Sequence, residues 1–155
     1  MMSKSSIPAL PCACATLRRA ARALTQHYEA ALRPFGLRST QFTILQALSF
    51  TGEITQGELG SILAMDSTTL TRTLEIMRRQ GWITKRRGKD RREWRLLIAR
   101  NGKAQLTRAL SAWQETQRDL KQRIGAEPWE QLMKLSNDVT AEITTTEDRD
   151  DKQRV

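Results

Sequence analysis

The sequence predicts a mainly α fold with one small β-hairpin. Apolar residues recur at three- and four-residue spacing along most of the 155 residues, which is typical of amphipathic helices. The pattern changes only over residues 82–98, where two short runs of strand composition flank a turn at residues 88–91. Two short helical segments joined by a tight turn precede the hairpin, as in a helix-turn-helix. Together these observations predict a winged helix-turn-helix lobe.

Two helices are predicted ahead of the helix-turn-helix itself. The first covers residues 11–35, and Pro34 and Gly36 end it. Its apolar stripe contains Cys14, Leu17, Ala21, Leu24, Tyr28, Ala31 and Phe35. Ser39 is expected to cap the second helix, which ends near Gly52.

The helix-turn-helix is predicted to begin at Thr55. Thr55 and Glu58 have the spacing of a capping box, in which each side chain accepts a hydrogen bond from the other residue's backbone N–H. Asp66 is expected to cap the next helix, which runs to about Gln80 and stops at Gly81.

Two long helices are predicted after the hairpin. Asn101 and Gly102 are expected to break the second strand, and Trp113 and Leu120 then lie on the apolar stripe of a long helix. A last amphipathic helix follows Gly125.

The outer helices have broad apolar stripes and no obvious partner within the lobe, so we expect them to be buried against a second copy of the chain. Residues 39–99 are predicted to form the winged helix-turn-helix lobe, and residues 12–38 and 100–145 the dimerisation helices. Residues 1–11 are expected to be a disordered N-terminal segment and residues 146–155 a flexible charged tail.

The charge of the chain indicates a polyanionic partner. The formal net charge is +9, and residues 78–95 contain nine basic side chains against two acids, Asp90 and Glu93. Such an excess favours nucleic acid or an anionic membrane surface. No apolar run approaches the length of a membrane span and no secretory signal is recognisable, so we expect a cytoplasmic protein without membrane contact.

The residues that carry catalysis or hold metals are scarce. Two cysteines cannot form a disulfide framework, and one histidine, His27, is too few for the usual zinc site within one chain. No Gly-rich phosphate loop is present. The sequence therefore predicts neither an enzyme nor a required metal or cofactor.

Two groups of residues are predicted to contact DNA. On the helix over residues 67–80, Leu70, Leu74 and Met77 are expected to be buried, and the opposite face to be exposed. The DNA-contacting residues predicted on this helix are Ser67, Thr68, Thr69, Thr71, Arg72 and Arg79. Short hydroxyl side chains can approach phosphates and base edges, and Arg72 can pair bidentately with guanine. A merely solvated face is the alternative for this helix taken alone.

The hairpin tip is the second predicted DNA contact, because a narrow minor groove attracts inserted arginine. Its residues are Arg86, Arg87, Lys89, Asp90, Arg91 and Arg92. We expect Asp90 to pair with Arg92 and fix its direction. Trp82 and Trp94 are expected to brace the hairpin against the lobe.

A series of short motifs runs along most of the chain, at residues 36–37, 41–42, 55–59, 66–72, 81–83, 90–92 and 101–102. In this order and spacing the motifs resemble those of the MarR family of bacterial regulators. The resemblance implies a triangular dimer with intertwined terminal helices. It also implies that Ser67, Thr68, Thr69 and Arg72 lie on the recognition helix and that Arg92 enters the minor groove. The usual Leu-Thr after the second strand is Ile98-Ala99 here, so the long helix lacks a capping hydroxyl and an irregular start is expected.

The resemblance also implies release from DNA by a small phenolic or aromatic acid, or by an oxidant. His27 and Tyr28 lie where the first helix should line the family's ligand pocket. Cys12 and Cys14 are expected to be two small, half-buried residues, and sensing of redox state or soft metals at a dimer interface, near Arg18 and Arg19, is the alternative.

The favoured function is therefore that of a homodimeric, sequence-specific transcriptional regulator, expected to be a repressor, on a near-palindromic operator. A sequence-tolerant architectural DNA-binding protein is the alternative. The residues do not identify the operator or the effector.

Overall fold

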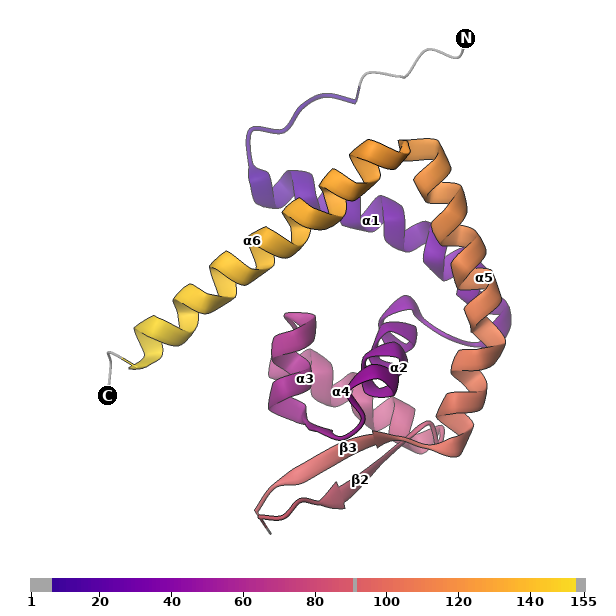
Figure 1. Ribbon diagram of the computed structural model, residues 1–155, viewed down its shortest axis with the longest axis vertical. Helices are drawn as coiled ribbons and strands as arrows, with labels where there is room; N and C mark the ends of the chain where they lie inside the picture. Colours follow the sequence, from indigo (N-terminus) through magenta and orange to yellow (C-terminus); the bar gives the residue numbers. More distant parts are fainter. Residues whose placement is uncertain (1–6, 91, 153–155) are drawn as a thin grey trace.

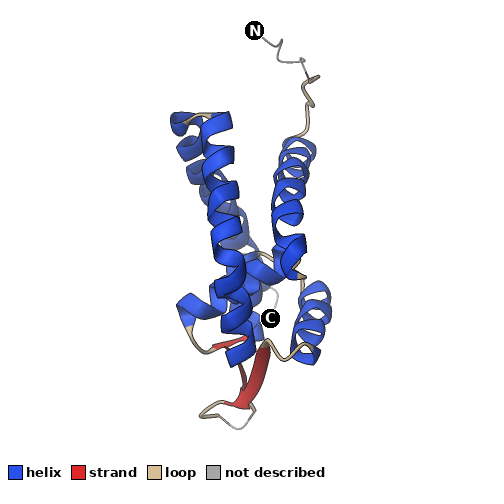
Figure 2. Cartoon of the chain, turned by 90° about the vertical axis from the view of Figure 1, so that its right-hand side faces the viewer, coloured by secondary structure: helices blue, strands red, loops and turns tan. Residues whose placement is uncertain are grey.

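The computed structural model of the protein describes residues 7–90 and 92–152. The short helices and the hairpin form a small lobe, and the long helices stand beyond it (Figure 1). Turned by 90°, the long helices rise from one end of the lobe and the hairpin projects from the other (Figure 2). The mainly α fold with a hairpin wing is confirmed.

The first helix is joined to the lobe by a capping interaction that the sequence did not indicate. Helix α1 (Ala13–Leu32) continues into a 3-10 turn (Arg33–Phe35), and α2 (Ser39–Thr51) follows. Ser39 was expected to cap α2, but Arg38 occupies that position and Ser39 is the first helical residue. The Ser39 amide and hydroxyl both donate to Glu29 Oε1, at 2.8 Å each. A carboxylate from α1 therefore satisfies the N-terminus of α2.

The two predicted caps of the helix-turn-helix are confirmed. In α3 (Gln56–Leu63), Thr55 Oγ1 accepts from the Glu58 amide at 3.1 Å, and Glu58 Oε2 accepts from the Thr55 amide at 2.6 Å. In α4 (Ser67–Arg79), Asp66 Oδ1 accepts from the Thr69 amide at 2.8 Å. The turn between the helices contains Ala64 in the left-handed region, with φ of 48°.

The hairpin belongs to a three-stranded antiparallel sheet. Strands β2 (Ile83–Arg87) and β3 (Trp94–Ile98) were predicted, whereas the two-residue β1 (Ile54–Thr55) was not. The strand order is β1-β3-β2, and Ile54 and Lys85 both lie opposite Leu96. Because β1 directly precedes α3, this pairing ties the helix-turn-helix to the hairpin.

The junction between the sheet and α5 (Arg100–Ile124) is closely packed. Asn101 and Gly102 do not break the strand as expected, since β3 ends at Ile98 and both residues lie in the first turn of α5. Ala99 supplies no side-chain cap, as predicted, but the helix is regular from Arg100. The Ala99 amide instead donates to the Trp82 carbonyl oxygen at 2.8 Å.

The core lies where α2, α3 and α4 pack on the sheet and on α5. Its fully buried side chains include Phe42, Leu45, Leu59, Leu70, Leu74, Met77, Ile83 and Leu96. Trp113 of α5 packs against this core from the side of the long helices. The lobe is therefore continuous with the base of the helices that stand beyond it.

Helical structure extends into the C-terminal segment, and the N-terminal segment contacts α1. Helix α6 (Ala126–Lys152) packs on α5 and continues through residues 146–152, which were expected to be a flexible tail. Arg19 Nη1 donates to the Pro8 carbonyl oxygen at 2.9 Å, so part of the predicted disordered segment contacts α1. Residues 1–6 and 153–155 lie outside the described residues.

Candidate DNA-binding surface

Helix α4 divides into a buried and an exposed face, as its sequence predicted. Leu70, Leu74 and Met77 are 2% exposed or less. The six predicted contact residues are all exposed, namely Ser67, Thr68, Thr69, Thr71, Arg72 and Arg79. The helix therefore presents hydroxyl groups at its N-terminal end, where the backbone dipole favours a phosphate.

Thr71 differs from its neighbours because its hydroxyl is already engaged. Thr71 Oγ1 donates to the Ser67 carbonyl oxygen at 2.7 Å and accepts from Gln56 Nε2 at 2.8 Å. Gln56 is the first residue of α3, so this contact fixes the two helices of the helix-turn-helix relative to each other. Sequence reasoning missed Gln56, because nothing in its local pattern separates it from any polar residue at a helix start.

Glu75 compensates the charge at the C-terminal end of α4. Its carboxylate accepts from Arg78 at 2.9 and 3.1 Å and from Arg79 Nε at 3.2 Å. The hydrogen bond from Arg78 is the main reason that the pKa of Glu75 falls from 4.5 to about 2, and Arg79 adds to the effect. Arg72, by contrast, has neither a hydrogen-bond nor an ion-pair partner within the part of the chain that the structure describes.

Two hairpin arginines are paired with acidic side chains of the same chain. Arg86 forms an ion pair with Glu53, which immediately precedes β1. Arg95 Nη2 lies 2.6 Å from Glu93 Oε1, and Arg95 Nη1 donates to the Glu53 carbonyl oxygen at 3.3 Å. Glu53 was not predicted as part of the wing, because it meets Arg86 only through the strand order β1-β3-β2.

Arg87 contacts an aromatic side chain. Its guanidinium lies 4.3 Å from the centre of the Trp94 ring, and the two residues are direct partners across the hairpin. Trp94 is 47% exposed, so the expectation that it braces the hairpin against the lobe is wrong. Trp82 does pack against the core, as predicted.

The hairpin tip is organised by Asp90, but not in the expected way. Asp90 Oδ1 accepts from the backbone amide of Arg92 at 2.9 Å, and the Asp90 carbonyl oxygen accepts from the Glu93 amide at 3.0 Å. Among the described residues, no ion pair joins Asp90 to the Arg92 guanidinium. Asp90 therefore shapes the turn, and the Arg92 side chain is exposed. Lys89 is exposed beside it, and Arg91 lies outside the described residues.

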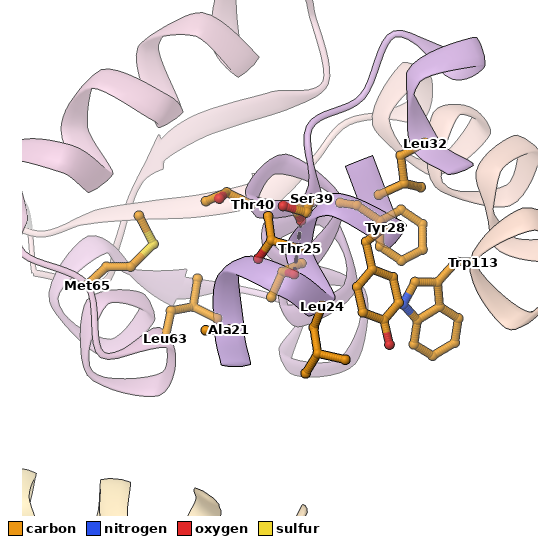
Figure 3. A pocket seen from close by; sticks show the side chains of 12 residues that line it. Ala21, Leu24, Thr25, Tyr28, Leu32, Ser39, Thr40, Leu63, Met65 and Trp113 are labelled. Carbon is orange, nitrogen blue, oxygen red and sulfur yellow. Dashed lines mark hydrogen bonds between the residues drawn. The ribbon is translucent and has the colours of Figure 1, made fainter. Parts of the chain in front are cut away.

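A pocket of about 470 Å³ lies where α1 and α5 meet the lobe. Tyr28 and Trp113 lie on one side of it and Leu63 and Met65 on the other (Figure 3). Partial burial raises the pKa of the Tyr28 hydroxyl, which donates to Gln117 Oε1 of α5. Tyr28 thus lines the pocket as predicted, whereas His27 is exposed and is not part of its lining.

The two cysteines lie at the start of α1, far along the chain from the lobe. Cys12 and Cys14 are both exposed rather than half-buried, and both are free thiols. Arg18 Nη2 donates to Cys14 Sγ at 3.7 Å, while Arg19 is directed to Pro8. Among residues 7–90 and 92–152, no three His, Cys, Asp or Glu side chains are grouped so that they could hold a metal ion. None of the helices described there is both long and apolar enough to cross a membrane.

This lobe, with its helix-turn-helix, arginine-bearing hairpin and adjoining long helices, defines the chain as a winged helix-turn-helix protein. The sequence model of the MarR family matches residues 37–94, which cover the lobe as far as the start of β3. The transcriptional regulator MosR of M. tuberculosis, solved in complex with DNA, is 36% identical, with a TM-score of 0.77. That match covers 86% of this chain and 97% of MosR. The chain belongs to the MarR family of transcriptional regulators.

Two further comparisons agree with this assignment. The HTH-type transcriptional regulator YwoH of Bacillus subtilis (strain 168) is 36% identical over 77 residues, which are 50% of this chain and 56% of YwoH. The matched part thus spans little more than half of that relative. A mutant of MarR from E. coli, complexed with operator DNA, has a TM-score of 0.74. It is 21% identical, and the match covers 81% of this chain and 91% of that one, so it shows the fold alone.

Proposed function

We propose that this chain is a sequence-specific DNA-binding transcriptional regulator that acts as a homodimer on a near-palindromic operator and represses transcription. The observation that carries the proposal is the exposed face of α4, on which Ser67, Thr68 and Arg72 stand beside the cationic hairpin. A helix of this kind inserts its N-terminal residues into the major groove. Arg72 is the residue best placed to pair with guanine, and Lys89 and Arg92 of the hairpin tip are placed for the flanking minor groove.

The dimer is supported by the apolar side chains that the long helices expose. Leu17 of α1 is 45% exposed, and Val139 and Ile143 of α6 are 46% and 61% exposed. Large apolar side chains at spacings that fall on one helical face are stabilised when a second copy covers them. A two-fold dimer presents two copies of α4, which is why the operator is expected to be near-palindromic. MosR of M. tuberculosis, which is 36% identical, was solved in complex with DNA, and this supports DNA binding by the present chain.

Two signals for release remain as separate hypotheses. The pocket has aromatic walls in Tyr28, Phe42 and Trp113, and its lining includes the hydroxyl groups of Thr25 and Thr40, which suits a small aromatic or phenolic acid. The exposed thiols of Cys12 and Cys14 suit an oxidant or a soft metal instead. Titrating operator-bound protein with aromatic carboxylic acids tests the first. An unchanged response to peroxide and arsenite after joint substitution of both cysteines by serine would exclude the second.

The proposal is tested by selecting duplexes from a random pool with the purified protein and measuring affinity against salt by fluorescence anisotropy. A repressor of this kind should prefer the selected duplex to a scrambled one by about a thousandfold or more. Affinity for both should fall steeply as salt rises, because phosphate contacts release counterions. A preference near one would favour the sequence-tolerant architectural alternative, and no binding would overturn both.

Arg72→Ala provides the residue-level test. It should cost about 1–3 kcal/mol at one or two base pairs of each half-site and leave the other positions as selective as before. Arg118→Ala removes the same charge from an exposed position on α5, outside the lobe, and is the matched control. Equal losses in the two variants would show that Arg72 acts through net charge and not through a base contact.

A further inference from the structure

Helix α1 is attached to the rest of the molecule at three points near its C-terminal end. Its last residue, Leu32, is buried in the core of the lobe. Tyr28 donates to Gln117 and so ties α1 to α5. Glu29 contacts the first turn of α2. Among the described residues, every hydrogen bond between α1 and the lobe involves Glu29. The packing of Leu32 anchors the end of α1, but apolar packing is non-directional and does not by itself fix the angle of the helix.

The N-terminus of α2 depends on Glu29 because no adjacent residue can cap it fully. Arg38 occupies the N-cap position, and a guanidinium has only donors, so it cannot satisfy the backbone N–H groups of the first turn. The Gln41 side chain accepts from the Arg38 amide at 2.9 Å. Glu29 Oε1 accepts from both the amide and the hydroxyl of Ser39, at 2.8 Å each, and Arg38 Nη1 lies 3.5 Å from Glu29 Oε2. Such charge-assisted hydrogen bonds are directional, so they fix how α1 meets α2.

The space beside this contact is open. The pocket of about 470 Å³ lies between α1 and the lobe, and Ser39 is part of its lining (Figure 3). Filled interiors resist movement of their parts, whereas a pocket of this size leaves room for α1 and α2 to tilt relative to each other. We propose that Glu29 is a positioning residue for DNA recognition, which holds the lobe through Ser39 at a fixed angle to the dimerisation helices.

The angle of α2 determines the direction of the recognition helix α4. Phe42 and Leu45 of α2 share one core with Leu70 and Leu74 of α4, and all four are 2% exposed or less. A tilt of α2 against α1 therefore tilts α4 as well. Successive base pairs of B-DNA are about 3.4 Å and about 35° apart, so a small change in this angle at each lobe misaligns the two recognition helices with their half-sites. The inference rests on the proposed function, since it requires a dimer that contacts two half-sites.

The experiment compares operators that differ in the spacing of their half-sites. The duplex selected by the full-length wild type is lengthened or shortened by one base pair at its centre, and affinity is measured by fluorescence anisotropy. The wild type should lose about tenfold or more on either altered duplex, because a displaced half-site loses at least one base contact. Glu29→Ala should weaken binding at the selected spacing by about three- to ten-fold and reduce the penalty for altered spacing to about threefold or less.

Two milder variants grade the effect. Glu29→Gln keeps an oxygen that accepts from Ser39, and Ser39→Ala keeps the amide that donates to Glu29. Both should therefore show spacing penalties between those of the wild type and Glu29→Ala. Thermal unfolding of each variant reports whether it is folded at the temperature of the binding measurement. If Glu29→Ala does not fold, these two variants provide the same test.

The matched controls remove the same chemical groups elsewhere. Glu115→Gln removes a negative charge from an exposed position on α5, and Ser49→Ala removes a hydroxyl from an exposed position on α2. Both should keep the wild-type spacing penalty. If the variants at positions 29 and 39 also keep that penalty, whatever their affinity or stability, the inference is overturned and DNA binding remains established. A wild type that binds all spacings equally would instead overturn the proposed binding of a dimer to two half-sites.

Discussion

Gly102→Ala tests whether the long helices are anchored to the lobe at the junction seen in the structure. Gly102 is buried in the first turn of α5, and a methyl group there would overlap the Trp82 carbonyl oxygen and lie 2.9 Å from its carbonyl carbon. The Ile98 side chain would lie 3.0 Å away on another side. The oxygen cannot turn aside, because it belongs to the backbone and accepts the Ala99 amide.

The magnitude follows from two opposing effects. Alanine is more favourable than glycine inside a helix by about 1 kcal/mol. Overpacking a filled site costs about 1–3 kcal/mol, and contact with a fixed carbonyl places this site at the upper end. The net loss of unfolding free energy should therefore be about 2 kcal/mol, which lowers Tm by about 4–8 °C for a chain of this size.

Gly57→Ala is the matched control for this substitution. Gly57 also lies in the first turn of a helix, but the added methyl group would meet only Thr55 Oγ1, at 4.0 Å. This variant should equal or exceed the stability of the wild type, by up to about 1 kcal/mol. Both variants are compared by thermal unfolding at one protein concentration, since dimer stability depends on concentration. A Gly102→Ala protein as stable as the wild type would refute the close packing of α5 on Trp82.

Three further substitutions test other parts of the structure. Glu75→Gln releases Arg78 and Arg79 and should steepen the salt slope on scrambled DNA by up to about 1.8 per protomer, which lowers the specificity ratio. Because the pKa of Glu75 is lowered to about 2, its carboxylate stabilises the fold fully above its ordinary pKa of 4.5. That contribution is lost as pH falls toward 2, so the difference in Tm between wild type and this variant should vanish in acid. Burial raises the pKa of Glu29, but hydrogen bonds from Ser39 and Arg38 outweigh it and lower the pKa overall, so Glu29→Gln should destabilise the protein at neutral pH and not in acid. Arg92→Ala should weaken binding mainly to duplexes with A·T-rich flanks, and unchanged affinity on every flank would contradict its minor-groove role.

The elements that the sequence predicts correctly are those set by local interactions. The capping box at Thr55, the cap at Asp66 and the stop at Gly81 each depend on residues within four positions, so their geometry follows from spacing alone. Strand β1 is only two residues long and forms because β3 offers a free edge beside it. Two residues are too few to show the alternating pattern of a strand, so β1 could not be predicted from the sequence. Trp94 was wrongly predicted to pack against the lobe. Alternation along a strand shows which face of the sheet a side chain lies on, but it does not show how far the core extends under that face.

The candidate site was predicted as a set of residues, but not as a set of contacts. Hydrophobic spacing placed the exposed face of α4 correctly, since Leu70, Leu74 and Met77 fix which side is buried. The partners of the arginines could not be predicted, because Glu53 reaches Arg86 through two strand pairings and Trp94 reaches Arg87 through the register of the hairpin. Asp90 was assigned to the correct loop, yet a short carboxylate beside a free backbone amide closes a turn more readily than it holds a mobile guanidinium.

The excess of positive charge in this chain is a poor guide to the strength of its DNA contacts. A net charge of +9 attracts any polyanion, and the salt-dependent affinity that it produces does not distinguish one sequence from another. Discrimination between DNA sequences is favoured instead by compensation of this charge, because Glu53, Glu75 and Glu93 form ion pairs with arginines of the lobe. Arg72 keeps its charge on the face of α4 that can reach base edges. Arginines that are already paired with carboxylates of the same chain gain less from contact with any phosphate. A larger share of the affinity for DNA therefore depends on the base sequence that Arg72 contacts.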